Sequence, residues 1–132
     1  CVIKEIYLNI PILDINRSRH FFTELGFTIN ENFSSQNNLC VVINPNINVM
    51  LTQNDLFTKM IDRAIAPKNT NEAIISIDCI EKVTVSKIVN KAIELGAKKI
   101  NEPEDQGFMY SWSFEDLDGH LWDLFWMNPD HQ

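Results

Sequence analysis

Two hydrophobic periodicities alternate along this chain. Residues 4–12 place isoleucine or leucine at every second position from residue 6, which predicts a strand with one apolar face. Residues 17–25 carry apolar side chains at helical spacing, and Asp14 or Asn16 can cap the start of that helix. Gly26 follows where a left-handed residue commonly ends a helix. The opening segment is therefore predicted to be a strand followed by a helix.

Shorter alternating segments come next. They predict three strands and then a helix, over residues 27–33, 39–44, 47–53 and 55–65. The polar run 68–72 after this helix is the best candidate for a linker.

The second half of the chain repeats the order of the first. Leu95-Gly96-Ala97 ends a predicted helix as Leu25-Gly26-Phe27 ends the earlier one, about half a chain apart. The elements predicted for this half are a strand, a helix and three further strands, over residues 73–78, 83–95, 97–101, 107–115 and 120–127.

This repeat predicts an α+β fold made of two βαβββ modules. Module 1 spans about 4–53, a linker helix about 55–66, and module 2 about 72–127. Each module alone would have a small core, so we expect both to pair into one domain over residues 1–132. The expected architecture is a curved mixed sheet with helices outside and a central cleft, where a ligand would bind.

Composition narrows the range of partners. The 132 residues include 11 Lys and Arg against 18 Asp and Glu, a formal net charge of −7. Such a surface repels phosphates, which argues against nucleic acid and anionic membranes and favours a neutral or cationic small molecule. Cys1, Cys40 and Cys79 show no C-x-x-C spacing and are odd in number, which predicts free thiols. No apolar stretch is long enough to span a bilayer and no export signal is visible, so we expect a cytoplasmic protein.

Three segments resemble the vicinal oxygen chelate superfamily, which includes glyoxalase I, extradiol dioxygenases, fosfomycin resistance enzymes and bleomycin resistance proteins. They are LNIPILDINRSRHFFTELGF at 8–27, LGA at 95–97 and FEDLDGHLWDLFWM at 114–127. The resemblance looks closest to a branch of predicted lactoylglutathione lyases. It implies a glyoxalase-like fold, and it leaves open whether the chain is an enzyme, because the fold hosts isomerases, oxygenases, transferases and binding proteins.

The resemblance also implies positions for a divalent metal, whose usual ligands are His, Glu or Gln. The matching residues here are Tyr7, Met50, Glu72 and Asp123. A phenol must ionise before it binds a cation, and a thioether prefers soft Cu(I). We therefore predict no family metal centre and no cofactor, with Glu72 and Asp123 as weak candidate ligands should a divalent metal bind.

Strand parity gives candidate residues for the cleft. Tyr7 and Asn9 share a face with Glu5, and Asp123 shares one with Phe125. Tryptophans at strand spacing fit either a ligand platform or the core or dimer interface. Asp123 fits either a structural hydrogen bond to a Tyr, a Ser or a backbone amide, or a role as general base or ligand anchor. The predicted ligand-binding residues are Tyr7, Asn9, Met50, Glu72, Tyr110, Trp112, Asp123 and Phe125.

Three functions fit these residues. The first is a metal-free binding protein, resembling bleomycin resistance proteins, that holds a small aromatic or cationic molecule in an aromatic and acidic cleft. The second is a metal-dependent glyoxalase-type lyase or isomerase that uses Glu72 and Asp123. The third is a metal-free enzyme with Asp123 as base and Tyr7 as acid. An open sheet leaves edges to cover, so we expect a homodimer in each case.

Overall fold

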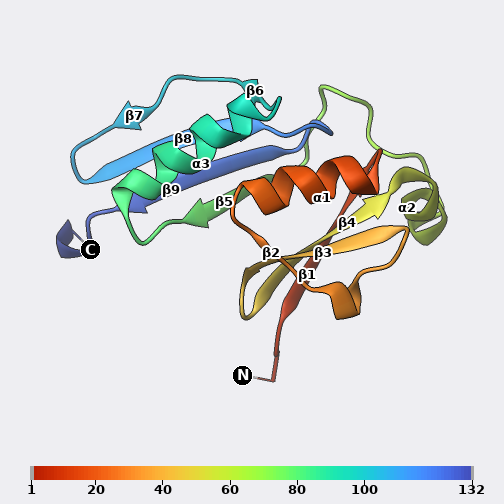
Figure 1. Cartoon of the computed structure of the whole chain (residues 1–132). Coiled ribbons are helices and arrows are strands. Elements are labelled where there is room, and N and C mark those ends of the chain that lie inside the picture. The colour runs from red at the N-terminus through yellow and green to blue at the C-terminus, as the bar shows by residue number, and fades with distance from the viewer. Residues whose placement is uncertain (1, 132) are drawn as a thin grey trace. The chain divides into compact units, whose positions relative to one another are not determined.

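The computed structural model describes residues 2–131. The chain divides into two compact units, and the boundary between them lies between Ala66 and Pro67. Each unit holds one sheet with helices against it (Figure 1). The α+β class and the glyoxalase-like pattern predicted from the sequence are confirmed.

The first unit contains a four-stranded sheet in the order β1-β4-β3-β2. Strand β1 runs parallel to β4, and the other two pairs are antiparallel. Its elements are β1 (Ile6–Ile12), α1 (Ile15–Glu24), β2 (Thr28–Ile29), η1 (Glu31–Phe33), β3 (Asn38–Asn44), β4 (Ile47–Gln53) and α2 (Asn54–Ile61).

Local sequence signals fix both ends of α1. The Asp14 carboxylate accepts hydrogen bonds from the backbone amides of Asn16 and Arg17, which satisfies two donors of the first turn. At the other end Gly26 has φ +100°, and the amides of Gly26 and Phe27 close a Schellman motif.

One face of this sheet forms the core of the first unit. Strands β3 and β4 alternate so that their apolar side chains lie on the face covered by α1, and α1 contributes Phe21 and Phe22 to that interface. The sheet residues buried on this face are Leu39, Val41, Val49 and Leu51.

The second unit repeats this arrangement. Its sheet has the order β5-β9-β8-β6, with β7 also paired to β8, and β5 runs parallel to β9 as β1 does to β4. Its elements are β5 (Ile74–Asp78), α3 (Lys82–Glu94), β6 (Lys98–Lys99), β7 (Glu104–Asp105), β8 (Met109–Glu115), β9 (Leu121–Met127) and η2 (Pro129–His131).

Helix α3 covers the aromatic face of the second sheet (Figure 1). The Ser86 hydroxyl on α3 lies 2.6 Å from the Tyr110 hydroxyl on β8. Trp112 and Trp122 are buried on the same face. Gly96 has φ +108° and closes the same Schellman motif as Gly26, which confirms the predicted structural repeat.

The largest difference from the sequence-based assignment lies at residues 27–33. The predicted strand is only the two residues of β2, and the chain then turns into η1. The Asn30 side chain accepts a hydrogen bond from the amide of Asn32 and so caps the 3₁₀ turn, which competes with strand pairing. Strand β7 was also not predicted from the sequence. Among residues 2–131, no helix has the length and apolar character needed to cross a membrane.

Candidate ligand-binding site

The helix-free face of the first sheet carries the predicted residues of the first module. Tyr7 lies opposite Asn48 on β4, and Asn9 lies opposite Met50. Directly opposite residues share a face, so Tyr7, Asn9 and Met50 are on one surface, together with Cys40 of β3. This face points away from the apolar core beneath α1.

A carboxylate, a phenol and an amide are joined on this face. Glu5 Oε1 accepts hydrogen bonds from the Tyr7 hydroxyl at 3.3 Å and from Asn48 Nδ2 at 3.2 Å. The Asn48 amide also contacts the carbonyl of Ile6 at 3.4 Å and the Cys40 thiol at 3.9 Å. The half-buried Glu5 carboxylate is thus held in place by neutral donors.

An exposed aromatic pair lies beside that carboxylate. The rings of Tyr7 and Phe33 stack with centroids 5.8 Å apart and an interplanar angle of 28°. Tyr7 is 36% exposed and Phe33 is 53% exposed, so much of the pair faces outward. A large apolar ring is usually buried, which makes this pair a candidate binding surface.

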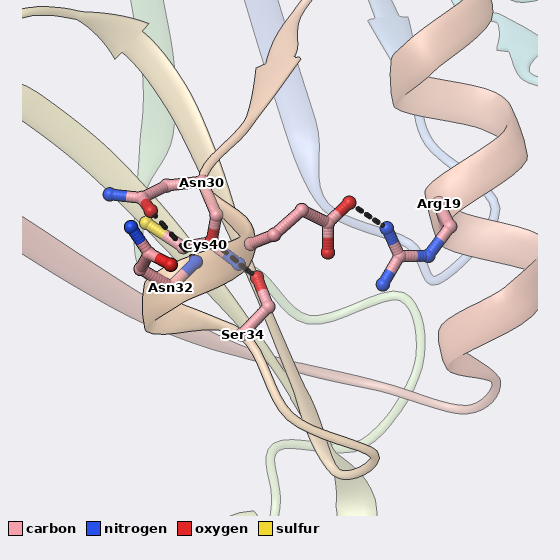
Figure 2. Close-up of polar contacts among 6 residues, drawn as sticks. Arg19, Asn30, Asn32, Ser34 and Cys40 are labelled. Atoms are coloured by element: carbon pink, nitrogen blue, oxygen red, sulfur yellow. Dashed lines mark hydrogen bonds and ion pairs between the residues drawn. The ribbon is translucent and has the colours of Figure 1, made fainter.

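Hydrogen bonds to β3 place η1, and with it Phe33, over the sheet. The Ser34 hydroxyl donates to the carbonyl of Asn30 at 2.8 Å and accepts from the Cys40 amide at 3.0 Å. The Asn30 amide in turn donates to the Cys40 carbonyl at 2.9 Å. Figure 2 shows these side chains gathered around Cys40, with Arg19 of α1 to one side. Arg19 forms a 2.6 Å ion pair with Glu31 of η1, which ties the turn to the helix as well.

The Tyr7 phenol stays protonated at neutral pH. Its pKa is raised above the ordinary 10.0, first by partial burial and then by the Glu5 carboxylate, whose charge and hydrogen bond both favour the neutral phenol. The Cys40 thiol has its pKa raised by burial and by Glu5, so it is an inert structural thiol.

The helix-free face of the second sheet carries Asp123 and Phe125. The Ser113 hydroxyl donates to Asp123 Oδ1 at 2.9 Å, and Ser76 lies opposite Asp123 on the neighbouring strand. The sequence left open whether a Tyr, a Ser or a backbone amide would partner Asp123, and a serine within the same sheet does so. Asp123 is partly exposed and hydrogen-bonded, not a lone buried charge.

Tyr110 and Trp112 lie on the opposite face of that sheet. Strand register groups them with Leu124 and Trp126, under α3, and not with Asp123. Trp112 is 6% exposed, and its Nε1 donates to the Asn101 carbonyl at 2.9 Å. The expectation that these two aromatics line one surface with Asp123 and Phe125 therefore needs correction. Consecutive strand residues alternate between faces, and Tyr110 and Trp112 have the parity of the core.

Glu72 lies just before β5 and is exposed. Glu72 is not paired in the sheet, because the strand register begins at Ile74. An exposed side chain is the usual state of a glutamate beside a polar linker. Across residues 2–131, no three His, Cys, Asp or Glu side chains lie close enough together to hold a metal ion.

Sequence reasoning missed the chemistry of Asp116, which holds the turn between β8 and β9. Its Oδ2 accepts from Trp122 Nε1 at 2.8 Å, while Oδ1 accepts from the amides of Asp118 and His120 at 2.9 and 3.0 Å. Burial raises the pKa of this carboxyl, against the opposing effects of His120 and the hydrogen bonds. The available signal was the Asp-x-Asp-Gly run, with an aspartate two residues before the turn.

Comparisons with known proteins agree with this architecture. The family model described as bleomycin resistance protein-like N-terminal matches residues 5–44, which include β1, α1, η1 and β3. Hypothetical protein SA1046 from S. aureus is 28% identical with a TM-score of 0.81, covering 95% of this chain and 94% of that one. A glyoxalase/bleomycin resistance protein/dioxygenase family enzyme from Burkholderia phytofirmans is 20% identical with a TM-score of 0.79, covering 92% and 96%.

A more divergent structure has the same fold. Fosfomycin resistance protein FosX from Listeria monocytogenes is 18% identical with a TM-score of 0.66, covering 91% of this chain and 87% of that one. The chain is therefore similar to bleomycin resistance protein-like sequences over residues 5–44, and it shares its fold with these solved structures. No curated protein matches the sequence. A shared fold does not establish a shared reaction, so the function of this chain has to be argued from its own side chains.

Proposed function

We propose that this chain binds a small aromatic or cationic molecule on its helix-free sheet surface and does so without the metal centre of the superfamily's enzymes. One observation carries the proposal: the exposed Tyr7–Phe33 stack lies next to the Glu5 carboxylate. A flat ligand ring stacking on such a pair gains about 0.5–1.5 kcal/mol beyond the burial of its area.

The chemistry of the potential metal ligands supports the metal-free part of the proposal. Tyr7 matches the first metal position of the superfamily, and its raised pKa makes the anionic ligand form harder to reach. Met50, near the third position, offers only a thioether. Of the two carboxylates in the predicted set, Glu72 is exposed just before β5, and one oxygen of Asp123 already accepts from Ser113. This set of side chains fits a divalent cation poorly.

Calorimetry on chelator-treated protein tests the proposal. The titrants are bleomycin, after the matching family, a planar aromatic cation such as ethidium, and fosfomycin as a small anion. We expect micromolar to submillimolar binding of an aromatic cation, unchanged by chelator, and no binding of fosfomycin, because the net charge is −7.

Two results would overturn the proposal. One is the absence of binding better than millimolar for every aromatic tested. The other is binding, or turnover of the hemithioacetal of methylglyoxal and glutathione, that appears only when Mn²⁺, Ni²⁺ or Zn²⁺ is restored, which would favour the lyase that uses Glu72 and Asp123. Light scattering on the same sample reports whether the chain pairs, since we also propose a homodimer.

A further inference from the structure

We propose that Glu5 is the counter-ion for a protonated amine, and that the preferred ligand is an aromatic molecule bearing a primary or secondary ammonium group. The inference rests on the proposed binding function and adds to it the residue and the chemical class. Strand parity puts Glu5 on the same face as Tyr7 and Asn9, but neither Glu5 nor Phe33 nor Asn48 was among the predicted ligand-binding residues.

The first argument is the state of the Glu5 carboxylate. Its side chain is 23% exposed, so water solvates it only in part, and two neutral donors share a single oxygen, Oε1. The other oxygen, Oε2, faces Lys4 across 3.9 Å, at the outer limit of an ion pair, and the Lys4 side chain is 90% exposed. An ammonium group that approaches Oε2 therefore competes with a loose and largely solvated cation.

The second argument is the position of the rings. The Tyr7 hydroxyl that donates to Glu5 belongs to the ring that stacks on Phe33, so carboxylate and aromatic pair form one continuous surface. A ligand ring on this pair places a short amine side arm beside the carboxylate. The cation then interacts with Glu5 and with the faces of the two rings, which attract positive charge.

The third argument is that this surface is built before a ligand arrives. Asn48, which is buried on β4, donates to Glu5 and fixes its carboxylate. The turn that carries Phe33 is fixed by two hydrogen bonds, from the Cys40 amide to the Ser34 hydroxyl and from the Asn30 amide to the Cys40 carbonyl. Figure 2 shows Asn30, Ser34 and Cys40 side by side. A rigid site loses less conformational entropy when the ligand binds. Asn48 and Ser34 act here as positioning residues, while Glu5, Tyr7 and Phe33 touch the ligand.

A matched ligand pair tests the inference. The probes are 2-(1-naphthyl)ethylammonium and 2-(1-naphthyl)ethanol, which share a ring and differ in the charged group. By calorimetry at low salt, we expect the ammonium to bind about tenfold more tightly than the alcohol, the ratio typical of one charge-assisted hydrogen bond. Raising the salt from about 0.05 M to about 0.5 M should weaken ammonium binding alone, because it screens only the charged contact.

Glu5→Gln is the decisive variant, since the glutamine amide oxygen can still accept from Tyr7 and Asn48. It should reduce the ratio to about one while leaving the affinity for the alcohol within about twofold. Glu94→Gln on α3 is the matched control, because it makes the same change of net charge at an exposed residue and should leave the ratio unchanged. Nuclear magnetic resonance spectra of both variants establish that the sheet is intact.

The outcomes separate the two proposals. If both probes bind equally and Glu5→Gln changes neither affinity, the counter-ion role is wrong and the aromatic binding function stands. If the ammonium is preferred but Glu94→Gln removes the preference as fully as Glu5→Gln, the effect is one of net charge, and the role of Glu5 is again wrong. If neither probe nor any aromatic cation binds, both proposals fail.

Discussion

In the first unit, the sheet face away from the helix carries Glu5, Tyr7 and Asn48 in one hydrogen-bonded cluster, whereas in the second unit it carries Asp123 with serines. The backbones beneath these faces are arranged alike. In both, the first strand pairs in parallel with the last, and the helix ends in a Schellman motif. The helix-covered face must remain apolar to form a core, so the other face is free to change its chemistry.

The two equivalent hairpins differ in the same way. Between β3 and β4, Asn44 Oδ1 accepts from the exposed amide of Asn46 at 2.9 Å, and the strand register shifts there. Between β8 and β9, the buried Asp116 carboxylate accepts from three donors, including the buried indole of Trp122. The side-chain acceptor of the first turn is an exposed asparagine, whereas that of the second turn is a buried carboxyl group.

The largest effect we predict comes from this difference. Asp116→Ala should lower the free energy of unfolding by about 3 kcal/mol, because it leaves the Trp122 N–H and two amides without their acceptor. Asn44→Ala should lower it by about 0.5 kcal/mol, as for an exposed turn contact. Urea unfolding followed by tryptophan fluorescence measures both.

Asp116→Asn serves as the control for the buried carboxylate. An amide has one acceptor oxygen in place of two, so it can accept from either the Trp122 indole or the turn amides. The free energy of unfolding should therefore fall by less in Asp116→Asn than in Asp116→Ala, and by more than in Asn44→Ala. Equal losses for Asp116→Ala and Asn44→Ala would show that the buried carboxylate is not what holds the second turn.

A smaller difference is expected at the two helix ends. Gly26 and Gly96 both have a positive φ, so replacement by alanine should cost about 1 kcal/mol at either residue. A Cβ at residue 26 meets open space, whereas one at residue 96 lies 3.4 Å from Leu117 Cδ2, so Gly96→Ala should cost somewhat more. Asparagine tolerates this conformation, and Gly26→Asn should recover part of the stability. A larger loss at Gly26 in urea unfolding would contradict this ranking.

Much of the fold was predictable because its signals are local. Strand β4 occupies the predicted residues 47–53. The predicted cap at Asp14 and the predicted helix ends at Gly26 and Gly96 are also confirmed. The turn at Glu31–Phe33 was not predictable from alternation, because the hydrogen bonds that replace strand pairing run from Asn30 and Ser34 to Cys40 on another strand.

The candidate site was only partly predictable for the same reason. Parity placed Glu5, Tyr7 and Asn9 on one face, and the register to β4 agrees with that grouping. Phe33 joins them only because η1 turns over the sheet, a contact between residues far apart in sequence. The register between β8 and β9 separates Tyr110 from Asp123. Parity within one strand gives neither that register nor the face that a helix covers, which depends on tertiary packing.

The smallest effect we predict concerns the ionisation of Tyr7, the residue that links the carboxylate to the aromatic pair. The pKa of Tyr7 is raised first by burial and then by Glu5, so Glu5→Gln should lower it toward the ordinary 10.0. The pKa of Tyr7 is thus higher in the folded chain than in the unfolded chain, where it is about 10. The associated stability is fully present below the unfolded pKa, and it is lost as the pH rises through the folded pKa. Ultraviolet titration of the phenolate, with Tyr7→Phe to assign the signal, measures the shift. A Tyr7 pKa that does not change in Glu5→Gln would mean that Glu5 has no electrostatic influence on Tyr7.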